Sequence, residues 1–141
     1  MRVARVLIAD DLPEIRERVT HILQSQFEIV GSAQNGEQAI TLAATLKPDL
    51  IVLDISMPVM NGLQAATRLR ESGNQVKLVF LSVHEDRDYI KAAFAVGAAG
   101  YVFKSRLASD LVPALRWVLH GRRFTSSFQP HAPASIGAQI A

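Results

Sequence analysis

Acidic side chains follow or end short apolar runs in this chain. Asp10 and Asp11 follow the apolar residues of "RVLIADD", and Asp54 ends the run in "LIVLDISMPVMNG". Further along, Ser82 ends "KLVFLS" and Lys104 follows "GYVF". Polar residues are common where strands turn, so each one alone has a simple structural explanation. Three carboxylates, a hydroxyl and an ammonium group are together a set that could do chemistry.

This set of groups suits phosphoryl chemistry supported by a divalent cation. Carboxylate oxygens are the ligands that Mg²⁺ prefers. When a cation offsets their repulsion, one carboxylate can attack a phosphoryl group and become an aspartyl phosphate, while a lysine and a hydroxyl contact the phosphoryl oxygens. Hydrolysis by a nucleophilic triad has no support, because the chain has no cysteine and no Gly-x-Ser-x-Gly sequence.

The elements that must position these groups alternate along the chain. The apolar runs are continuous, which is typical of strands buried on both faces of a parallel sheet. Segments of helical period separate them, with Asn35 as an expected N-cap and Pro13 in an expected first turn. Pro113 either lies in the first turn of a helix that begins near Ser109 or kinks a longer helix. The expected strands are 5–10, 28–33, 50–54, 77–82 and 100–103.

This alternation predicts an α/β fold: a doubly wound, five-stranded parallel sheet with helices on both faces. The carboxyl ends of parallel strands share one edge of such a sheet, where ligands bind. We therefore expect the acids, the serine and the lysine to meet there.

The bulk composition indicates one ordinary globular domain. The chain has 141 residues, 49% of them hydrophobic, and a formal net charge of +2, which is too small to argue for nucleic acid. No apolar stretch approaches the roughly 18 residues of a membrane span, and the amino-terminal run lacks a signal-peptide pattern. We expect a soluble, cytoplasmic domain over 1–123 and a flexible tail or linker remnant over 124–141, which has no charged residue.

The quoted motifs, in this order and at these intervals, resemble the receiver domain of bacterial two-component response regulators. The resemblance covers about residues 3–123. The segments "LSVHED" and "AAGYVFKS" are similar to sequences of the NarL/FixJ-type subfamily. It implies a flavodoxin-like sheet with strand order 2-1-3-4-5. It also implies a signalling module that catalyses only its own phosphorylation and dephosphorylation.

The resemblance further implies a role for each residue of the set. Asp54 would be the phosphoacceptor. Asp10, Asp11 and Asp54, with the backbone carbonyl of Ser56, would hold Mg²⁺. Lys104 would pair with the phosphoryl group, Ser82 would be the switch hydroxyl and Tyr101 the switch aromatic. Many receivers have proline after the lysine, but Ser105 follows it here, which leaves the geometry of that bond open.

The partners implied by the resemblance are a sensor histidine kinase or a phosphotransfer protein, and a homodimer is compatible with it. Relatives of this subfamily usually carry a C-terminal helix-turn-helix. Only 18 residues follow residue 123, so DNA is an expected partner only if such a module has been removed. The chain is either a truncated regulator or a receiver that works alone.

Three other functions remain open at this stage. A magnesium-dependent phosphatase could use acids at strand ends, although such enzymes generally need a second acid where Ser56 stands. An FMN-binding protein could share the fold, but the acidic "ADDLPE" would repel phosphate. A protein–protein interaction module of the same fold could also keep these residues without being phosphorylated.

Overall fold

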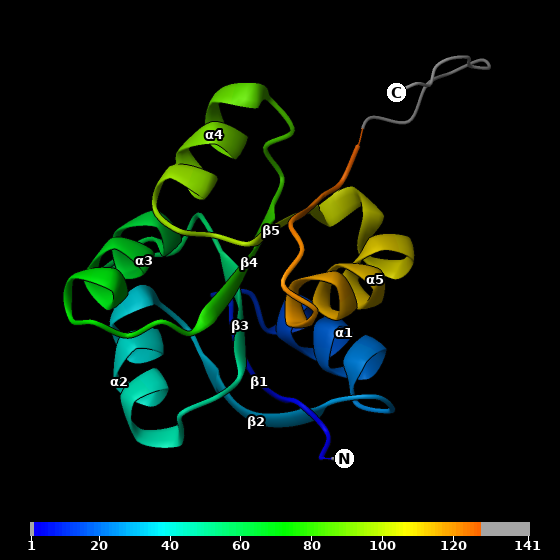
Figure 1. The fold of residues 1–141 in the computed structure, drawn as a ribbon, viewed down its shortest axis with the longest axis horizontal. Helices are drawn as coiled ribbons and strands as arrows, with labels where there is room; N and C mark the ends of the chain where they lie inside the picture. Colours follow the sequence, from blue (N-terminus) through cyan, green and yellow to red (C-terminus); the bar gives the residue numbers. More distant parts are fainter. Residues whose placement is uncertain (1, 128–141) are drawn as a thin grey trace.

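The computed structural model describes residues 2–127, in which six strands and five α-helices alternate through most of the chain (Figure 1). The strands are β1 (Arg5–Ala9), β2 (Glu28–Ala33), β3 (Leu50–Asp54), β4 (Lys77–Ser82), β5 (Gly100–Phe103) and β6 (Phe124–Thr125). The helices are α1 (Pro13–Leu23), α2 (Gly36–Leu46), α3 (Gly62–Glu71), α4 (Arg87–Ala95) and α5 (Leu107–Leu119), with a 3₁₀ turn, η1, at Lys104–Arg106. Among the described residues, no helix is both long enough and apolar enough to cross a membrane.

The strands form one sheet in the order β2-β1-β3-β4-β5-β6, and every neighbouring pair is parallel. The predicted order 2-1-3-4-5 is therefore confirmed, but the sheet has a sixth strand that the sequence analysis did not predict. Phe124 and Thr125, assigned to the start of a flexible tail, pair with Gly100 and Tyr101 at the sheet edge. The part of the expected tail from residue 128 onward lies outside the described residues.

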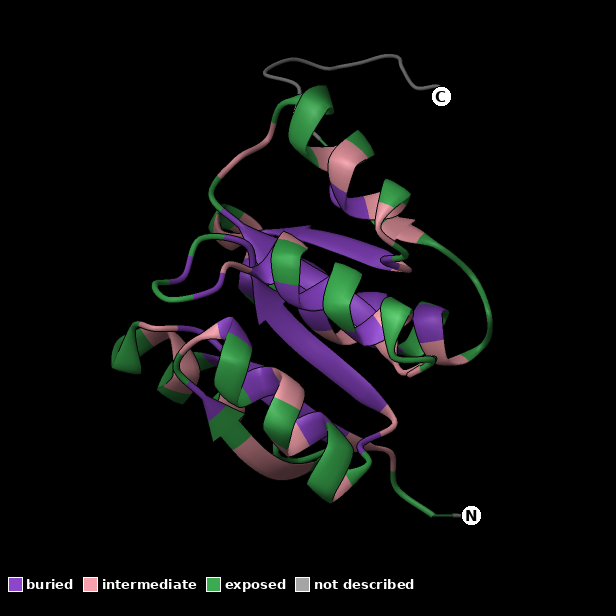
Figure 2. Cartoon of the chain, turned by 90° about the vertical axis from the view of Figure 1, so that its left-hand side faces the viewer, coloured by how far each residue is buried: buried purple, intermediate pink, exposed green. Residues whose placement is uncertain are grey.

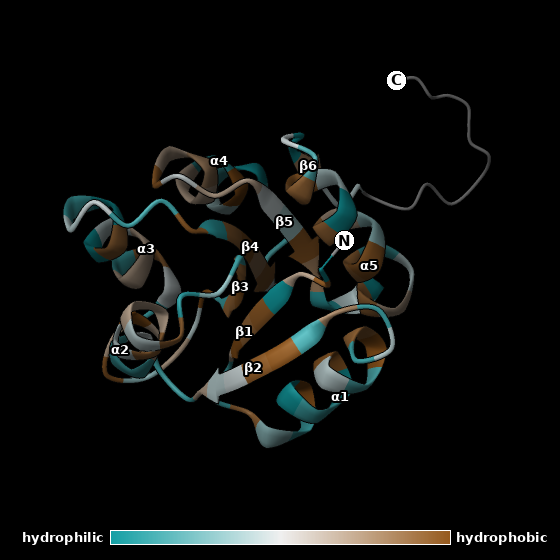
Figure 3. Ribbon diagram, turned by 60° about the horizontal axis from the view of Figure 1, so that its bottom comes forward, coloured by the Kyte–Doolittle hydropathy of each residue, from teal (hydrophilic) through white to brown (hydrophobic). Residues whose placement is uncertain are grey.

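Helices cover both faces of the sheet, so its strands are buried on two sides. In Figure 1, α1 and α5 lie on one side of the sheet and α2, α3 and α4 on the other. Val6 and Ile8 pack toward α1 and α5, whereas Leu7 and Ala9 pack in the other core. The central strands β1, β3 and β4 are accordingly mostly buried, and they are apolar except for charged or polar residues at their ends (Figures 2 and 3). This two-sided burial explains why the strands read as continuous apolar runs.

Local signals in the sequence set where the helices begin. Pro13 occupies the first position of α1. The side chain of Asn35 caps α2, and Asn61 forms a reciprocal capping box with Gln64 at the start of α3. Of the two alternatives for Pro113, the structure shows the longer helix: α5 begins at Leu107, before Ser109, and Pro113 lies on the exposed side of its second turn.

Gly62, the first residue of α3, lies against the end of β3. A Cβ atom at this position would overlap the backbone oxygen of Asp54 and would lie 3.0 Å from a ring carbon of Phe80. The amide of Gly62 also donates to the carbonyl of Ile55 at 2.8 Å. A residue without a side chain therefore allows α3 to approach the strand end that carries Asp54.

Replacement of this glycine should destabilise the fold. We expect Gly62→Ala to lower the free energy of unfolding by roughly 1–3 kcal/mol, because backbone must move to admit the methyl group. Gly31→Ala is the control, since its shortest contact is with the flexible end of Leu46, at 2.8 Å. Urea unfolding monitored by circular dichroism measures both changes. An equal loss in the two variants would contradict the close approach at Gly62.

Candidate functional site

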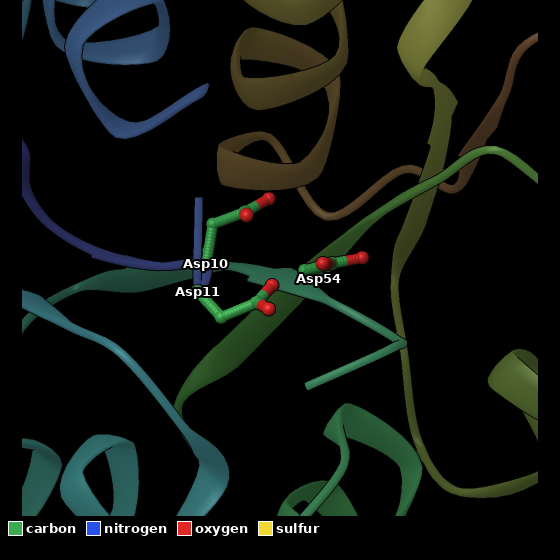
Figure 4. A group of neighbouring side chains, drawn as sticks. All are labelled: Asp10, Asp11 and Asp54. Atoms are coloured by element: carbon green, nitrogen blue, oxygen red, sulfur yellow. The ribbon is translucent and has the colours of Figure 1, made fainter. Parts of the chain in front are cut away.

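Three carboxylates meet at the carboxyl edge of the sheet. Asp10 and Asp11 follow β1, Asp54 ends the neighbouring β3, and one carboxylate oxygen of each lies within 4.8 Å of the others. Figure 4 shows the three side chains projecting into the same space. Asp10 and Asp54 are buried, and Asp11 is half-buried. The structure therefore brings together the acids that the sequence analysis expected to meet, and their oxygen-only donor set fits a hard divalent cation.

Lys104 supplies positive charge to this cluster. Its Nζ lies 2.9 Å from Asp10 Oδ2 and 3.2 Å from Asp54 Oδ2. Burial alone would lower the pKa of Lys104, but the hydrogen bond and charge of Asp10, together with Asp54, outweigh burial and raise it. Lys104 therefore stays protonated at neutral pH.

Asp10 is held firmly at its position. Its Oδ1 accepts a hydrogen bond from the amide of Leu12 at 2.9 Å, and Arg16 donates to its backbone carbonyl at 2.7 Å. Its Oδ2 lies 2.9 Å from Lys104 Nζ and has no other polar partner within residues 2–127. A carboxylate oxygen with a single polar partner still has a lone pair with which it can bind a cation.

Burial and the charge of Asp10 raise the pKa of Asp54 to about 6, whereas Lys104 acts in the opposite direction. The amide of Ser56 donates to Asp54 Oδ1 at 3.2 Å. Beside the carboxylates lies an open hollow of about 600 Å³, lined by Asp11, Ile55, Ser56, Met57, Pro58, Asn61, Leu63 and Tyr89. Ser56, the expected backbone ligand, is thus next to the acidic cluster.

The "Response regulator receiver domain" family matches residues 6–116. This chain belongs to that family. It is 38% identical to the nitrate/nitrite response regulator protein NarL of Escherichia coli (strain K12), over 98% of this chain and 65% of NarL. It is 36% identical to the transcriptional regulatory protein DegU of Brevibacillus brevis, over 83% of this chain and 50% of DegU. The chain therefore spans less than two thirds of these relatives.

Solved receiver structures share the fold. The signal receiver domain of the putative response regulator NarL from Mycobacterium tuberculosis has a TM-score of 0.82 and 31% identity, and covers 86% of this chain and 100% of that one. A two-component response regulator of the LuxR family from Aurantimonas sp. SI85-9A1 has a TM-score of 0.83 and 29% identity, over 87% and 89% of the two chains. The predicted family and fold are therefore confirmed, and the protein is a two-component signalling module.

The expected switch residues of the receiver are both linked to the backbone of His84. Ser82 is buried at the end of β4, one position beyond the partner of Asp54, and its Oγ accepts from the amide of His84 at 2.9 Å. Tyr101 is fully buried, and its hydroxyl donates to the carbonyl of His84 at 2.6 Å. The His84 ring stacks on Tyr89 with centroids 3.8 Å apart. The inward position of Tyr101 is thus fixed by a hydrogen bond.

Ser105, where many receivers have proline, takes part in a contact across the site. No peptide bond in the described part of the chain is cis, so the Lys104–Ser105 bond is trans. The hydroxyl of Ser105 donates to Glu85 Oε2 at 2.8 Å. This bond ties η1 to the segment between β4 and α4.

Two features near the site were missed in the sequence analysis. Val59, in the loop after Asp54, has a φ of 69°, which is strained for a β-branched residue. Ser126, assigned to the tail, is buried and hydrogen-bonded to Asp110. Phe124 and Thr125 are residue types that favour strands, but two residues are too few to predict the second feature, and nothing in the sequence indicated the first.

The raised pKa of Asp54 predicts a pH-dependent gain in stability for Asp54→Asn without metal. The native state of the wild type binds more protons than the unfolded state between about pH 4 and 6, so it loses stability as pH rises through this window. We expect the variant to be more stable by on the order of 1–2 kcal/mol above pH 7, and the difference to fade toward pH 4.

Thermal unfolding in the presence of a chelator, at several pH values, measures this difference. Asp88→Asn, which alters an exposed acid in the first turn of α4, is the control and should show no such trend. A stability difference that stays constant between pH 4.5 and 7.5 would contradict the assigned pKa.

Proposed function

We propose that this receiver domain accepts a phosphoryl group on Asp54, from a histidine kinase or a phosphotransfer protein, and that phosphorylation controls an output partner. The proposal rests on one observation: three carboxylates and Lys104 lie together at the carboxyl edge of the sheet. Family membership adds support, because receivers are the phosphorylated modules of two-component systems. In this reaction an Asp54 oxygen forms a bond to phosphorus, and the bond between phosphorus and the donor's leaving atom breaks with its electron pair.

Asp54 is better suited than Asp10 to act as the nucleophile. Asp10 is fully buried, and its two oxygens lie 2.9 Å from the amide of Leu12 and from Lys104 Nζ. The matching contacts of Asp54, with the amide of Ser56 and with Lys104 Nζ, are both longer, at 3.2 Å. The loop that directly follows Asp54 lines an open hollow, together with Asp11. With a pKa of about 6, its carboxylate is mostly ionised at neutral pH, as a nucleophile must be.

Asp10, Asp11 and Asp54, with the backbone carbonyl of Ser56, are the groups that we propose hold Mg²⁺. Their closeness and the spare capacity of Asp10 Oδ2 support this proposal. When bound, the cation would offset carboxylate repulsion and neutralise charge on the phosphoryl oxygens.

Lys104 and Ser82 would contact the transferred group directly. The ammonium already lies within 3.2 Å of Asp54 Oδ2, so a phosphoryl group on Asp54 would replace a carboxylate as its partner. The hydroxyl of Ser82 would turn toward the same oxygens and release the amide of His84. Because Tyr101 is hydrogen-bonded to His84, this change would also disturb the inward position of the tyrosine. Phosphorylation would thereby shift the population of two states.

Phosphorylation should require Asp54. We expect incubation with acetyl phosphate and Mg²⁺ to add one phosphoryl mass, labile to hydroxylamine, and Asp54→Asn to abolish it. Asp88→Asn, in an exposed acid of α4, should keep the adduct. Intact-protein mass spectrometry measures all three proteins. A hydroxylamine-labile adduct that persists in Asp54→Asn would exclude this residue as the phosphoacceptor.

Mg²⁺ binding should depend on Asp11. Loss of one carboxylate ligand in Asp11→Asn should weaken Mg²⁺ affinity by roughly tenfold or more, because hard cations select charged oxygen ligands. Isothermal titration calorimetry on metal-free protein measures the affinity, with Asp88→Asn as the matched substitution. Equal affinities in Asp11→Asn and the wild type would place the cation elsewhere.

A further inference from the structure

The segment after α5 is attached to the strand that leads into Lys104. The amide of Phe124 donates to the carbonyl of Ala99 at 3.0 Å, and the amide of Ser126 donates to the carbonyl of Tyr101 at 2.8 Å. These bonds hold β6 along the outer edge of β5. The segment lies beyond residues 6–116, the part of the chain that matches the family.

The hydroxyl of Ser126 makes two hydrogen bonds in a buried position. It accepts from the amide of Phe103 at 3.1 Å and donates to Asp110 Oδ2 at 2.6 Å. β6 ends at Thr125, so the amide of Phe103, at the end of β5, donates to the side chain of Ser126 rather than to a backbone carbonyl. Phe103 directly precedes Lys104, so Ser126 fixes the backbone on one side of the lysine.

Asp110, in the first turn of α5, fixes the other side. Its Oδ2 also accepts from Arg106 Nε at 3.0 Å, and its Oδ1 accepts from Ser109 at 2.9 Å. Burial alone would raise the pKa of Asp110, but the hydrogen bonds from Ser126, Arg106 and Ser109 lower it, so the carboxylate stays ionised. A continuous set of bonds therefore runs from Phe103 through Ser126 and Asp110 to Arg106, around the Lys104–Arg106 turn.

We propose that Ser126 and Asp110 are positioning residues for Lys104, so that the functional receiver extends to residue 126. This inference rests on the proposed function of Lys104 in phosphoryl transfer. Lysine has a long side chain with high rotamer entropy, and only its Nζ contacts the acidic cluster. Anchoring the backbone amide of Phe103 and the side chain of Arg106, on the two sides of Lys104, limits the positions that Nζ can reach. Misplacement of a reacting group by about 1 Å can slow a reaction by about 10²-fold.

The first test needs no phosphorylation. In metal-free protein labelled with ¹⁵N-lysine, the ammonium signal of Lys104 is assigned by its loss in Lys104→Met. We expect Ser126→Ala to speed the exchange of these ammonium protons with water at least fivefold, and Ser126→Thr to restore slow exchange. Val6→Ala removes buried core at the opposite end of the sheet and should leave the exchange unchanged. An exchange rate in Ser126→Ala within twofold of the wild type would overturn the proposal.

The second test separates positioning from general stability. At saturating Mg²⁺, Ser126→Ala should slow phosphorylation by acetyl phosphate at least fivefold and keep Mg²⁺ affinity within twofold, whereas Val6→Ala should react at the wild-type rate. In a Lys104→Met background, Ser126→Ala should cause no further slowing. An equal slowing in both backgrounds would show that Ser126 does not act through Lys104. If the wild type takes no phosphoryl group but the ammonium exchange changes as expected, the proposed function fails while the positioning of Lys104 stands.

Discussion

The concentration of negative charge at one edge of the sheet is the constraint on which the rest of the structure depends. Three carboxylates lie within 4.8 Å of one another, and the Lys104 ammonium is ion-paired with two of them. Burial, and after it the negative charge of Asp10, disfavour the ionised form of Asp54, which is why its pKa rises. The acidic cluster therefore lowers the free energy of unfolding. Burial of apolar side chains in the cores on the two faces of the sheet must offset this cost.

The strands and helices could be predicted from the sequence where the local residue pattern and the packing of the whole fold favour the same structure. Continuous apolar runs predicted the five main strands, and parallel topology then required Asp10, Asp54 and Lys104 to meet. β6 was not predicted, because two residues are too few to show a periodic pattern. Their partner strand, β5, also lies more than 20 positions earlier in the sequence. The positive φ of Val59 was also unpredictable, because a β-branched residue argues against that conformation.

The loops around the site show why its finer geometry cannot be read from motifs. Gly62 looks like an ordinary turn residue, yet the carbonyl of Asp54 occupies the space that a side chain would need. Ser105 departs from the proline common in receivers, and its hydroxyl instead reaches Glu85 across the site. Both contacts join segments that are far apart in the sequence or lie in different layers. Such contacts follow from the packed fold rather than from local propensity.

β5 connects the two ends of the site because it carries both Tyr101 and the residue before Lys104. The tyrosine is bonded to the carbonyl of His84 on one side, and the amide of Phe103 is bonded to Ser126 on the other. A strand of four residues between two hydrogen-bonded neighbours cannot easily shift at one end without moving at the other. Any movement of Lys104 toward a phosphoryl group would therefore change the positions of β6 and of Tyr101 as well. The size of that response would be limited by the difference between the contacts that Lys104 and Ser82 make without a phosphoryl group and those that we propose they make with one.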